Sequence, residues 1–438
     1  MRRTRMTVAA TALAGALLAG CGSSDGGGTG REGGSGGSAG AAPVKLAVPP
    51  EYDGARGWDQ EIDWVSEDAD ADPVTTDGDT VAYIIRSGNG YVVQARDGAT
   101  GKVRWTSAPY RTPVIDPDDV NAVQTPRLTT VRQGGRTYIV AWAIGEQPGD
   151  ALTKSKQVTQ ITIFAADASG RSVAPLHRVS VPIDARRNQA TVRDGGAGLL
   201  ITWNRTEKHS AVVDMPTGTV RQYDNAGALL PHCSNCWNDS VVAVSPKGPV
   251  VTGASGGLDV PGAWSSKDNA PKGLSGEGNG TLVGVRGGMF VAHWRSNDGA
   301  DAAVWSAHDL QSGRLLASTA CDNGTRYDTY SAVMSPNGTY LAFGSVVFDV
   351  RSGKALCLAG DTTRRGIEIV ALADDGTAYG VTDTETATKP VVELRVSTGS
   401  PKALPGGTLA PVATVSGGAV FTRREKGSGL RLSVRKKH

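Results

Sequence analysis

Asp97-Gly98-Ala99-Thr100-Gly101-Lys102, followed by Val103-Arg104-Trp105, is the stretch that decides the fold of this chain. It lies between two apolar runs and therefore predicts a tight turn between two strands. Asp can bond to its own backbone downstream, and Gly accepts the positive φ that such a turn needs. The same pattern recurs at Asp167–Arg171, Asp214–Thr219, Asp309–Arg314 and Asp349–Lys354, with a degenerate copy at Ser397–Ser400.

A second element precedes several of these turns. Ala332–Phe343 reads as strand, turn and strand around Ser335-Pro336-Asn337-Gly338, and Val241–Val251 and Ile369–Gly380 share that shape. Helical patterning is almost absent, so the chain is predicted to be all-β. The two elements together make four short strands per unit, at a spacing of roughly 40–50 residues that is typical of β-propeller blades. Stacking in a circle buries the faces that a single blade leaves exposed.

The repeat resembles the pyrroloquinoline-quinone-like and WD-repeat propeller superfamilies from about Trp58 to the C-terminus. The Asp97 turn with Trp105 is the nearest match to a quinoprotein-like blade, whereas the dipeptide Trp58-Asp59 does not lie at a blade end. We expect one propeller domain over residues 58–438. Six blades are marked by a copy of the turn described above. One blade without that turn is expected near Val241–Trp264, and a closing blade is expected at Val412–Val434. The segment Trp58–Trp64 is expected to supply the closing blade's missing strand. Eight blades are preferred, with seven as the alternative.

The N-terminal residues predict where in the cell the protein is located. Arg2, Arg3 and Arg5 precede the apolar stretch Val8–Ala19, which is too short to span a bilayer. Leu18-Ala19-Gly20-Cys21 then resembles the lipobox of bacterial lipoproteins. The resemblance implies that residues 1–20 are removed and that Cys21 carries a diacylglycerol. The mature protein would then lie on the extracytoplasmic face of the cell membrane. The alternative is a signal peptide that is cut elsewhere, with Cys21 incidental.

Between Cys21 and the propeller the chain is predicted to be a linker, residues 21–57. From Gly22 to Ala42 it is nearly all Gly, Ser and Ala, a composition that cannot bury enough apolar surface to order itself. A flexible linker of ~35 residues has an r.m.s. reach of ~30–35 Å. Such a linker would hold the propeller clear of a membrane surface without fixing its orientation.

Charge argues against nucleic acid as a partner. The leader holds three of the 45 basic residues, so the mature chain would carry 42 against 43 acidic ones, a net charge of −1. Sequence-independent binding to nucleic acid needs a basic stripe. Arg431, Arg435, Lys436, Lys437 and His438 are basic, and we interpret them as a solvated tail. A monomer is expected.

The four cysteines that remain after Cys21 predict two disulfides in an exported protein. Cys233 and Cys236 lie in His232-Cys233-Ser234-Asn235-Cys236-Trp237, where a structural disulfide is preferred to a zinc half-site or a redox pair. Cys321 follows one blade's last strand and Cys357 lies in the last strand of the next, so these two are expected to pair if their Cα atoms approach within ~7 Å.

No catalytic, cofactor-binding or metal-binding residues are predicted. By its resemblance, a quinoprotein dehydrogenase would need a disulfide between adjacent cysteines, and the chain has no Cys-Cys pair. The acidic runs lack the spacing of a known calcium loop. We therefore expect a non-enzymatic protein whose propeller is a protein-binding, scaffold or sensor module. Binding of a small molecule, sugar or cell-wall polymer is the alternative, and a quinoprotein-like dehydrogenase or a propeller hydrolase or lyase is a third possibility.

Overall fold

The computed structural model describes residues 43–62, 74–116, 119–184, 190–203, 209–224, 226–230, 240–252, 257–275, 280–295, 303–322, 331–382, 384, 389–425 and 429–438, with the backbone alone for Asp116 and for 119–123. All of these residues belong to one unit, Ala42–His438.

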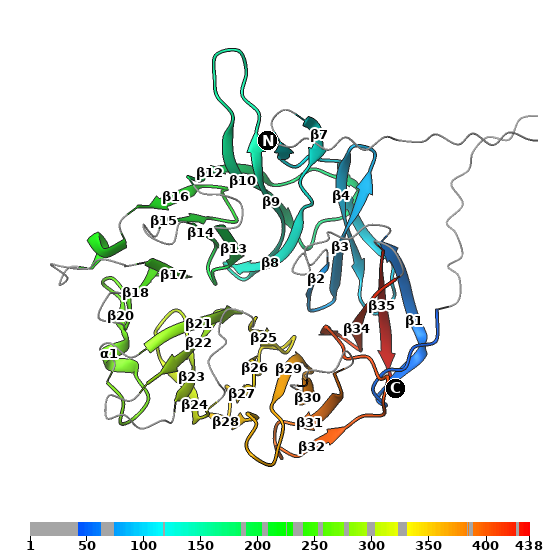
Figure 1. Cartoon of the computed structure of the whole chain (residues 1–438), viewed down its shortest axis with the longest axis vertical. Helices are drawn as coiled ribbons and strands as arrows, with labels where there is room; N and C mark the ends of the chain where they lie inside the picture. Colours follow the sequence, from blue (N-terminus) through cyan, green and yellow to red (C-terminus); the bar gives the residue numbers. More distant parts are fainter. Residues whose placement is uncertain are drawn as a thin grey trace, which may run out of the picture. The chain divides into compact units, whose positions relative to one another are not determined.

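Eight antiparallel sheets of four main strands follow one another in a ring around a common centre (Figure 1). We call each sheet a blade, number the blades 1 to 8 in the chain order of their innermost strands, and give the strands of each blade from the centre of the ring outward. The fold is therefore an eight-bladed β-propeller, which confirms the all-β prediction and the preferred blade count. The predicted unmarked blade near Val241–Trp264 is present as blade 4.

Each blade is a meander of consecutive strands, except where the chain begins and ends. Blade 1 comprises β2 (Val74–Asp77), β3 (Thr80–Ser87), β4 (Gly90–Asp97) and β5 (Val103–Ser107). Blade 2 comprises β8 (Arg127–Gln133), β9 (Arg136–Gln147), β10 (Lys156–Ala165) and β12 (His177–Pro182). Blade 3 comprises β13 (Ala190–Asp194), β14 (Leu199–Trp203), β15 (His209–Val213) and β16 (Val220–Tyr223). Blade 4 comprises β17 (Ser240–Ser245), β18 (Gly248–Thr252), β19 (Leu258–Val260) and β20 (Trp264–Ser265). Blade 5 comprises β21 (Gly280–Arg286), β22 (Met289–Trp294), β23 (Val304–Asp309) and β24 (Leu315–Ala320). Blade 6 comprises β25 (Val333–Met334), β26 (Tyr340–Phe343), β27 (Val346–Asp349) and β28 (Lys354–Cys357). Blade 7 comprises β29 (Ile367–Leu372), β30 (Thr377–Thr382), β31 (Val391–Arg395) and β32 (Pro401–Ala403). Blade 8 comprises β33 (Ala413–Val415), β34 (Gly418–Arg424), β35 (Leu430–Lys437) and, from the N-terminal side of the chain, β1 (Tyr52–Ile62).

Five short elements are added to this plan. β6 (Val114–Asp116) and β7 (Asp119–Val123) form a hairpin on the edge of β9, and β11 (Gly170–Val173) pairs in parallel with β5. One 3₁₀ turn, η2 (Ala226–Leu229), and one short helix, α1 (Ser266–Asn269), lie in connecting segments.

The core lies between blades. Each pair of neighbouring blades shares a cluster of buried apolar side chains, and this includes the pair formed by blade 8 and blade 1. Each blade is covered on both faces by its two neighbours. Its inner strands are therefore buried on both sides, as the first five residues of β3 show. The unbroken series of clusters makes the ring closed.

The recurrent turn has the geometry that its sequence predicts. Asp97 Oδ1 accepts hydrogen bonds from the Thr100 amide (2.8 Å) and the Thr100 hydroxyl (2.7 Å), and Gly101 follows with a φ of 70°. The side-chain bond from Arg104 and those from Thr100 outweigh burial and lower the pKa of Asp97 to about 2. The carboxylate is therefore charged at neutral pH and holds the turn.

The glycines of this turn also make room for a side chain from the outer strand of the preceding blade. Trp58, in the outer strand of blade 8, donates from Nε1 to the Gly98 carbonyl (3.0 Å), and its ring fills the space where Gly101 has no side chain. The same contact joins other blades: Trp264 on Gly313, His177 on Gly218 and Leu356 on Gly399. The turn motif thus sets the packing between blades as well as the hairpin within one.

The N-terminal segment closes the ring. β1 pairs antiparallel with β35, with Trp58 opposite Val434 and Ile62 opposite Leu430. This confirms that the first strand completes the last blade, although β1 already begins at Tyr52. Residues 43–57 were expected to belong to the linker, and the structure places them in the folded unit instead. Leu46 is buried in the cluster between blades 7 and 8.

Arg435 explains this difference and corrects the expectation of a solvated C-terminal tail. Its guanidinium is fully buried, lies 2.7 Å from the Asp59 carboxylate and donates to the carbonyl oxygens of Val44 (2.7 Å), Gly54 (3.0 Å) and Trp58 (3.2 Å). Burial opposes the charge on Asp59, but hydrogen bonds from Val44, Ser433 and Arg435 outweigh it and lower the pKa of Asp59. One side chain thus ties both chain ends together.

Blades 5 and 6 are joined covalently. Cys321, just after β24, and Cys357, in β28, form a disulfide with a Cα–Cα distance of 5.3 Å, as predicted. It links the outer edges of two neighbouring blades. Cys233 and Cys236 lie outside the described residues, as do Cys21 and the whole leader.

Candidate functional site

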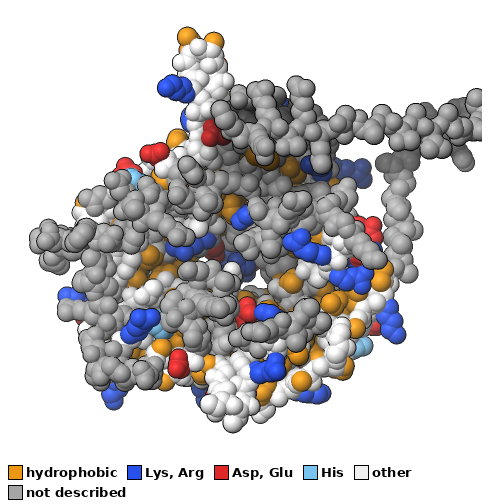
Figure 2. Space-filling view, in the orientation of Figure 1, with side chains coloured by type: hydrophobic (Ala, Val, Ile, Leu, Met, Phe, Trp, Pro, Cys, Tyr) orange, Lys and Arg blue, Asp and Glu red, His pale blue; other side chains and the backbone are white. Residues whose placement is uncertain are grey.

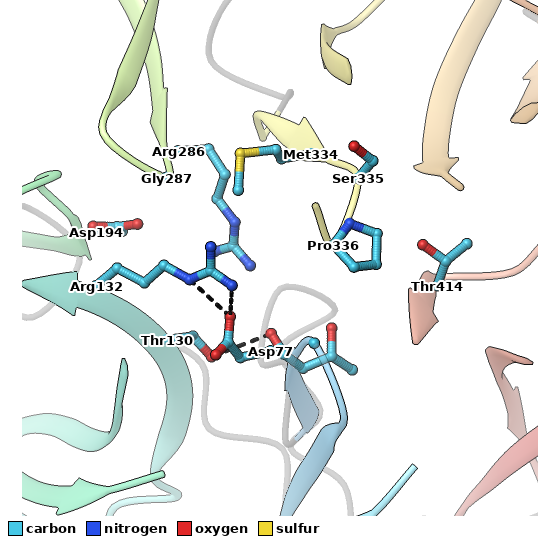
Figure 3. Close-up of a pocket in the computed structure, with 12 residues that line it drawn as sticks. Asp77, Thr130, Arg132, Asp194, Arg286, Gly287, Met334, Ser335, Pro336 and Thr414 are labelled. Atoms are coloured by element: carbon cyan, nitrogen blue, oxygen red, sulfur yellow. Dashed lines mark hydrogen bonds and ion pairs between the residues drawn. The ribbon is translucent and has the colours of Figure 1, made fainter. Parts of the chain in front are cut away.

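The innermost strands end at tight turns on one face of the ring, and their last residues converge on its centre. Six blades contribute to a small, open pocket there, which we call the hub pocket. Its charged residues are Asp77 at the end of β2, Arg132 in β8, Asp194 at the end of β13 and Arg286 at the end of β21 (Figure 3). Met334 of β25 adds an apolar wall.

Arg132 is held by Asp77. It donates from Nε (3.0 Å) and Nη2 (2.5 Å) to the same oxygen, Asp77 Oδ1. Beside this ion pair, the hydroxyl groups of Thr130 and Thr75 share a hydrogen bond of 2.6 Å. The ion pair fixes the side chain of Arg132 and uses part of its donor capacity.

Arg286 has no such partner. Its side chain points into the pocket toward Arg132 (Figure 3), and it donates no hydrogen bond to any residue that the structure describes. Asp194 stands beside the two arginines and accepts a hydrogen bond from the Gly196 amide (2.9 Å). Burial raises the pKa of Asp194 to about 6, although Arg286, the Gly196 amide and Arg132 oppose the shift. The pocket can therefore receive an anion, and its own charge changes near neutral pH.

A second feature projects from the ring. β9 and β10 extend beyond the other strands as a hairpin whose tip spans residues 148–155 (Figure 1). Leu152, at the tip, is 96% exposed, and Figure 2 shows apolar side chains there beside a basic one. We call residues 148–155 the β9–β10 tip.

The β9–β10 tip is rigidly built. Asp150 Oδ1 accepts hydrogen bonds from the amides of Leu152 and Thr153, both at 2.8 Å, and the Asp150 amide donates to the Thr153 carbonyl at 3.0 Å. These amide bonds lower the pKa of Asp150. At the base of the hairpin, β6 pairs with β9 through Val114 and Glu146. The structure therefore presents Leu152 on a defined turn.

One buried pair has the composition of a nucleophile and a base but not the access. The Ser306 hydroxyl lies 2.7 Å from His308 Nε2, and His308 Nδ1 lies 2.9 Å from the Gly313 carbonyl. Both side chains are buried in blade 5, where His308 stacks on Phe290. Burial lowers the pKa of His308 to about 4. A substrate cannot reach this pair, so we assign it to the packing of the blade.

The described residues contain no group of three or more His, Cys, Asp or Glu side chains placed to hold a metal ion. Within the same part of the chain, no helix has both the length and the apolar character needed to cross a bilayer.

Sequence reasoning named none of the residues of the hub pocket or of the β9–β10 tip. Three of the charged hub residues directly precede a glycine of the inner turn, in Asp77-Gly78, Asp194-Gly195 and Arg286-Gly287. That repeated placement is a signal, but only the ring brings the three positions together. The tip is marked by Gln147-Pro148-Gly149-Asp150, which separates two long apolar runs.

Comparisons with known proteins add no family. No family model matches the chain, and no curated protein matches it. Solved structures that resemble it include the Dos1 propeller, with 9% identity, a TM-score of 0.37 and coverage of 85% of this chain and 95% of that chain. The β-propeller domain of the Trilobed protease from Pyrococcus furiosus has 12% identity, a TM-score of 0.32 and coverage of 76% and 97%. The WD40 domain of Toxoplasma gondii coronin has 9% identity, a TM-score of 0.33 and coverage of 90% and 89%.

Proposed function

We propose that this protein is a lipid-anchored, extracytoplasmic lipoprotein whose propeller binds another protein as a scaffold or sensor module. The β9–β10 tip carries the proposal, because it holds a large apolar side chain almost fully in water. Burying a Leu side chain contributes about 1.5–3 kcal/mol. The turn around Asp150 is already ordered, so binding loses little conformational entropy there.

The repeat itself is proposed to be of the pyrroloquinoline-quinone-like type. The Asp97 turn and the docking of Trp58 on its glycine support this. The role is nevertheless proposed to be non-enzymatic. In support of this, the Ser306–His308 pair lies inside a blade.

Crosslinking of the full-length protein in its native envelope tests the protein-binding role. Replacing Leu152 with Asp is expected to reduce the yield of a specific crosslinked partner and to weaken the purified complex at least tenfold, since an anchor residue contributes more than about 1.4 kcal/mol. Ser155→Asp is the matched control, because it adds the same charge to the exposed tip without removing the leucine. Equal binding by both variants would exclude the tip as a contact.

The anchor is tested separately. Cys21→Ser is expected to abolish metabolic labelling with a fatty-acid analogue and to move the protein from the membrane fraction to the soluble fraction, because the lipid supplies the membrane affinity. Wild-type protein with an intact leader is the control. A Cys21→Ser protein that still carries the label would contradict the lipobox interpretation.

Binding of a small molecule, sugar or cell-wall polymer is the second candidate. The hub pocket favours it, because a cavity with converging charged groups is a typical ligand site. If no partner protein is recovered while a small molecule raises the melting temperature, this candidate replaces the first.

A further inference from the structure

Two like charges face each other in the hub pocket, and only one of them has a bound counter-charge. Arg132 is paired with Asp77, whereas Arg286 points toward Arg132 and has no ion-pair partner within 4 Å among the described residues. Two partly buried cations repel each other more strongly than they would in water. An arginine placed in this way is stabilised by an anion that enters the pocket.

We propose that the hub pocket binds a small oxyanion, a carboxylate or a tetrahedral phosphate or sulfate group, through the guanidinium of Arg286. The planar guanidinium offers a fork of donors that matches two oxygens of such a group. Two of the wall hydroxyls are already engaged, since Thr414 donates to the Leu372 carbonyl (2.5 Å) and Ser335 donates to Asn337 Oδ1 (3.0 Å). Recognition therefore depends on charge and on Arg286. This inference is independent of the lipid anchor and of the β9–β10 tip.

Asp194 makes the site sensitive to pH. The charged groups facing it are Arg286 and Arg132, while Asp77 is bound to Arg132 and the neighbouring Arg193 donates to the Val242 carbonyl (3.1 Å). Above the pKa of Asp194, its carboxylate competes with the ligand for Arg286. As the pH falls through about 6, the carboxylate takes up a proton and the pocket gains one unit of positive charge. Anion affinity therefore rises on acidification.

The test is calorimetric titration of the purified mature protein with sulfate and, in a second arm, with D-glucuronate, at pH 7.5 and pH 5 and constant ionic strength. We expect wild-type protein to bind at least one of the two anions and to bind it several-fold more tightly at pH 5. The arm with the tighter binding identifies the form of the group. A wild-type protein that binds neither anion at either pH would overturn the proposal.

Variants assign the binding to the pocket. Arg286→Gln is expected to weaken binding at least tenfold, and Arg351→Gln, which removes an exposed arginine from the turn after β27, is expected to leave it unchanged. Asp194→Asn should bind at pH 7.5 as wild type does at pH 5 and should lose the pH dependence. Melting curves verify that each variant is folded. Equal weakening by Arg286→Gln and Arg351→Gln would show a non-specific charge effect and refute the site.

Discussion

Replacing Arg435 with methionine is expected to lower the free energy of unfolding by about 3–5 kcal/mol, the usual effect of removing one partner of a buried ion pair. The substitution leaves the Asp59 carboxylate without its counter-charge and three carbonyl oxygens, those of Val44, Gly54 and Trp58, without their donor. These groups belong to β1 or to the segment just before it, so the loss falls on the closure of the ring. Denaturant unfolding of the full chain measures it.

Lys436→Met is the matched control, because the neighbouring side chain is exposed and its replacement should change stability by less than about 0.5 kcal/mol. Asp59→Asn in the Arg435→Met background should restore part of the loss, since it removes the unpaired charge. If Arg435→Met unfolds at the same denaturant concentration as Lys436→Met, the buried arginine does not stabilise the closure.

Removing the disulfide is expected to have the second largest effect. Cys321 and Cys357 are separated by 36 residues. The chain-entropy relation for a loop of that length gives about 4 kcal/mol of stabilisation, and measured values are typically 2–4 kcal/mol. The double variant Cys321→Ser, Cys357→Ser should therefore unfold at a lower denaturant concentration than wild type by an amount that corresponds to this loss.

Reductant separates this bond from the second predicted one. It should destabilise wild-type protein at least as far as the double variant. Any further shift that reductant causes in the double variant then reports on Cys233 and Cys236. A double variant as stable as oxidised wild type would contradict the assigned contribution of the Cys321–Cys357 bond.

The repeated turn made the fold predictable, because its chemistry is local. Asp97, Thr100 and Gly101 lie within five residues of one another, and the hydrogen bonds that Asp97 makes in the turn join residues no more than seven positions apart. Counting the turns and the paired strands between them led to a preference for eight blades over seven. The Cys321–Cys357 pairing followed in the same way, once both residues could be placed at the ends of neighbouring blades.

Features that depend on closure were not predictable. Alternation in Leu430–Arg435 placed Arg435 on the side away from the core, which is correct for a sheet with one solvated face. In the ring, that side is covered by residues 43–57, which were predicted to be part of the linker. The hub pocket has the same origin, because Asp77, Asp194 and Arg286 are far apart in the chain and meet only when all the blades are in place.

The pairing of β1 with β35 has a consequence for biosynthesis. A polypeptide that leaves the ribosome or a translocation channel N-terminus first releases β1 long before Leu430–Lys437 emerges. Until then the unpaired edges of the first strand are open to association with other chains. Contacts of such sequence separation form slowly. The eight residues of β35 therefore complete the fold, and a chaperone that protects the nascent chain would have to cover β1 until β35 has emerged.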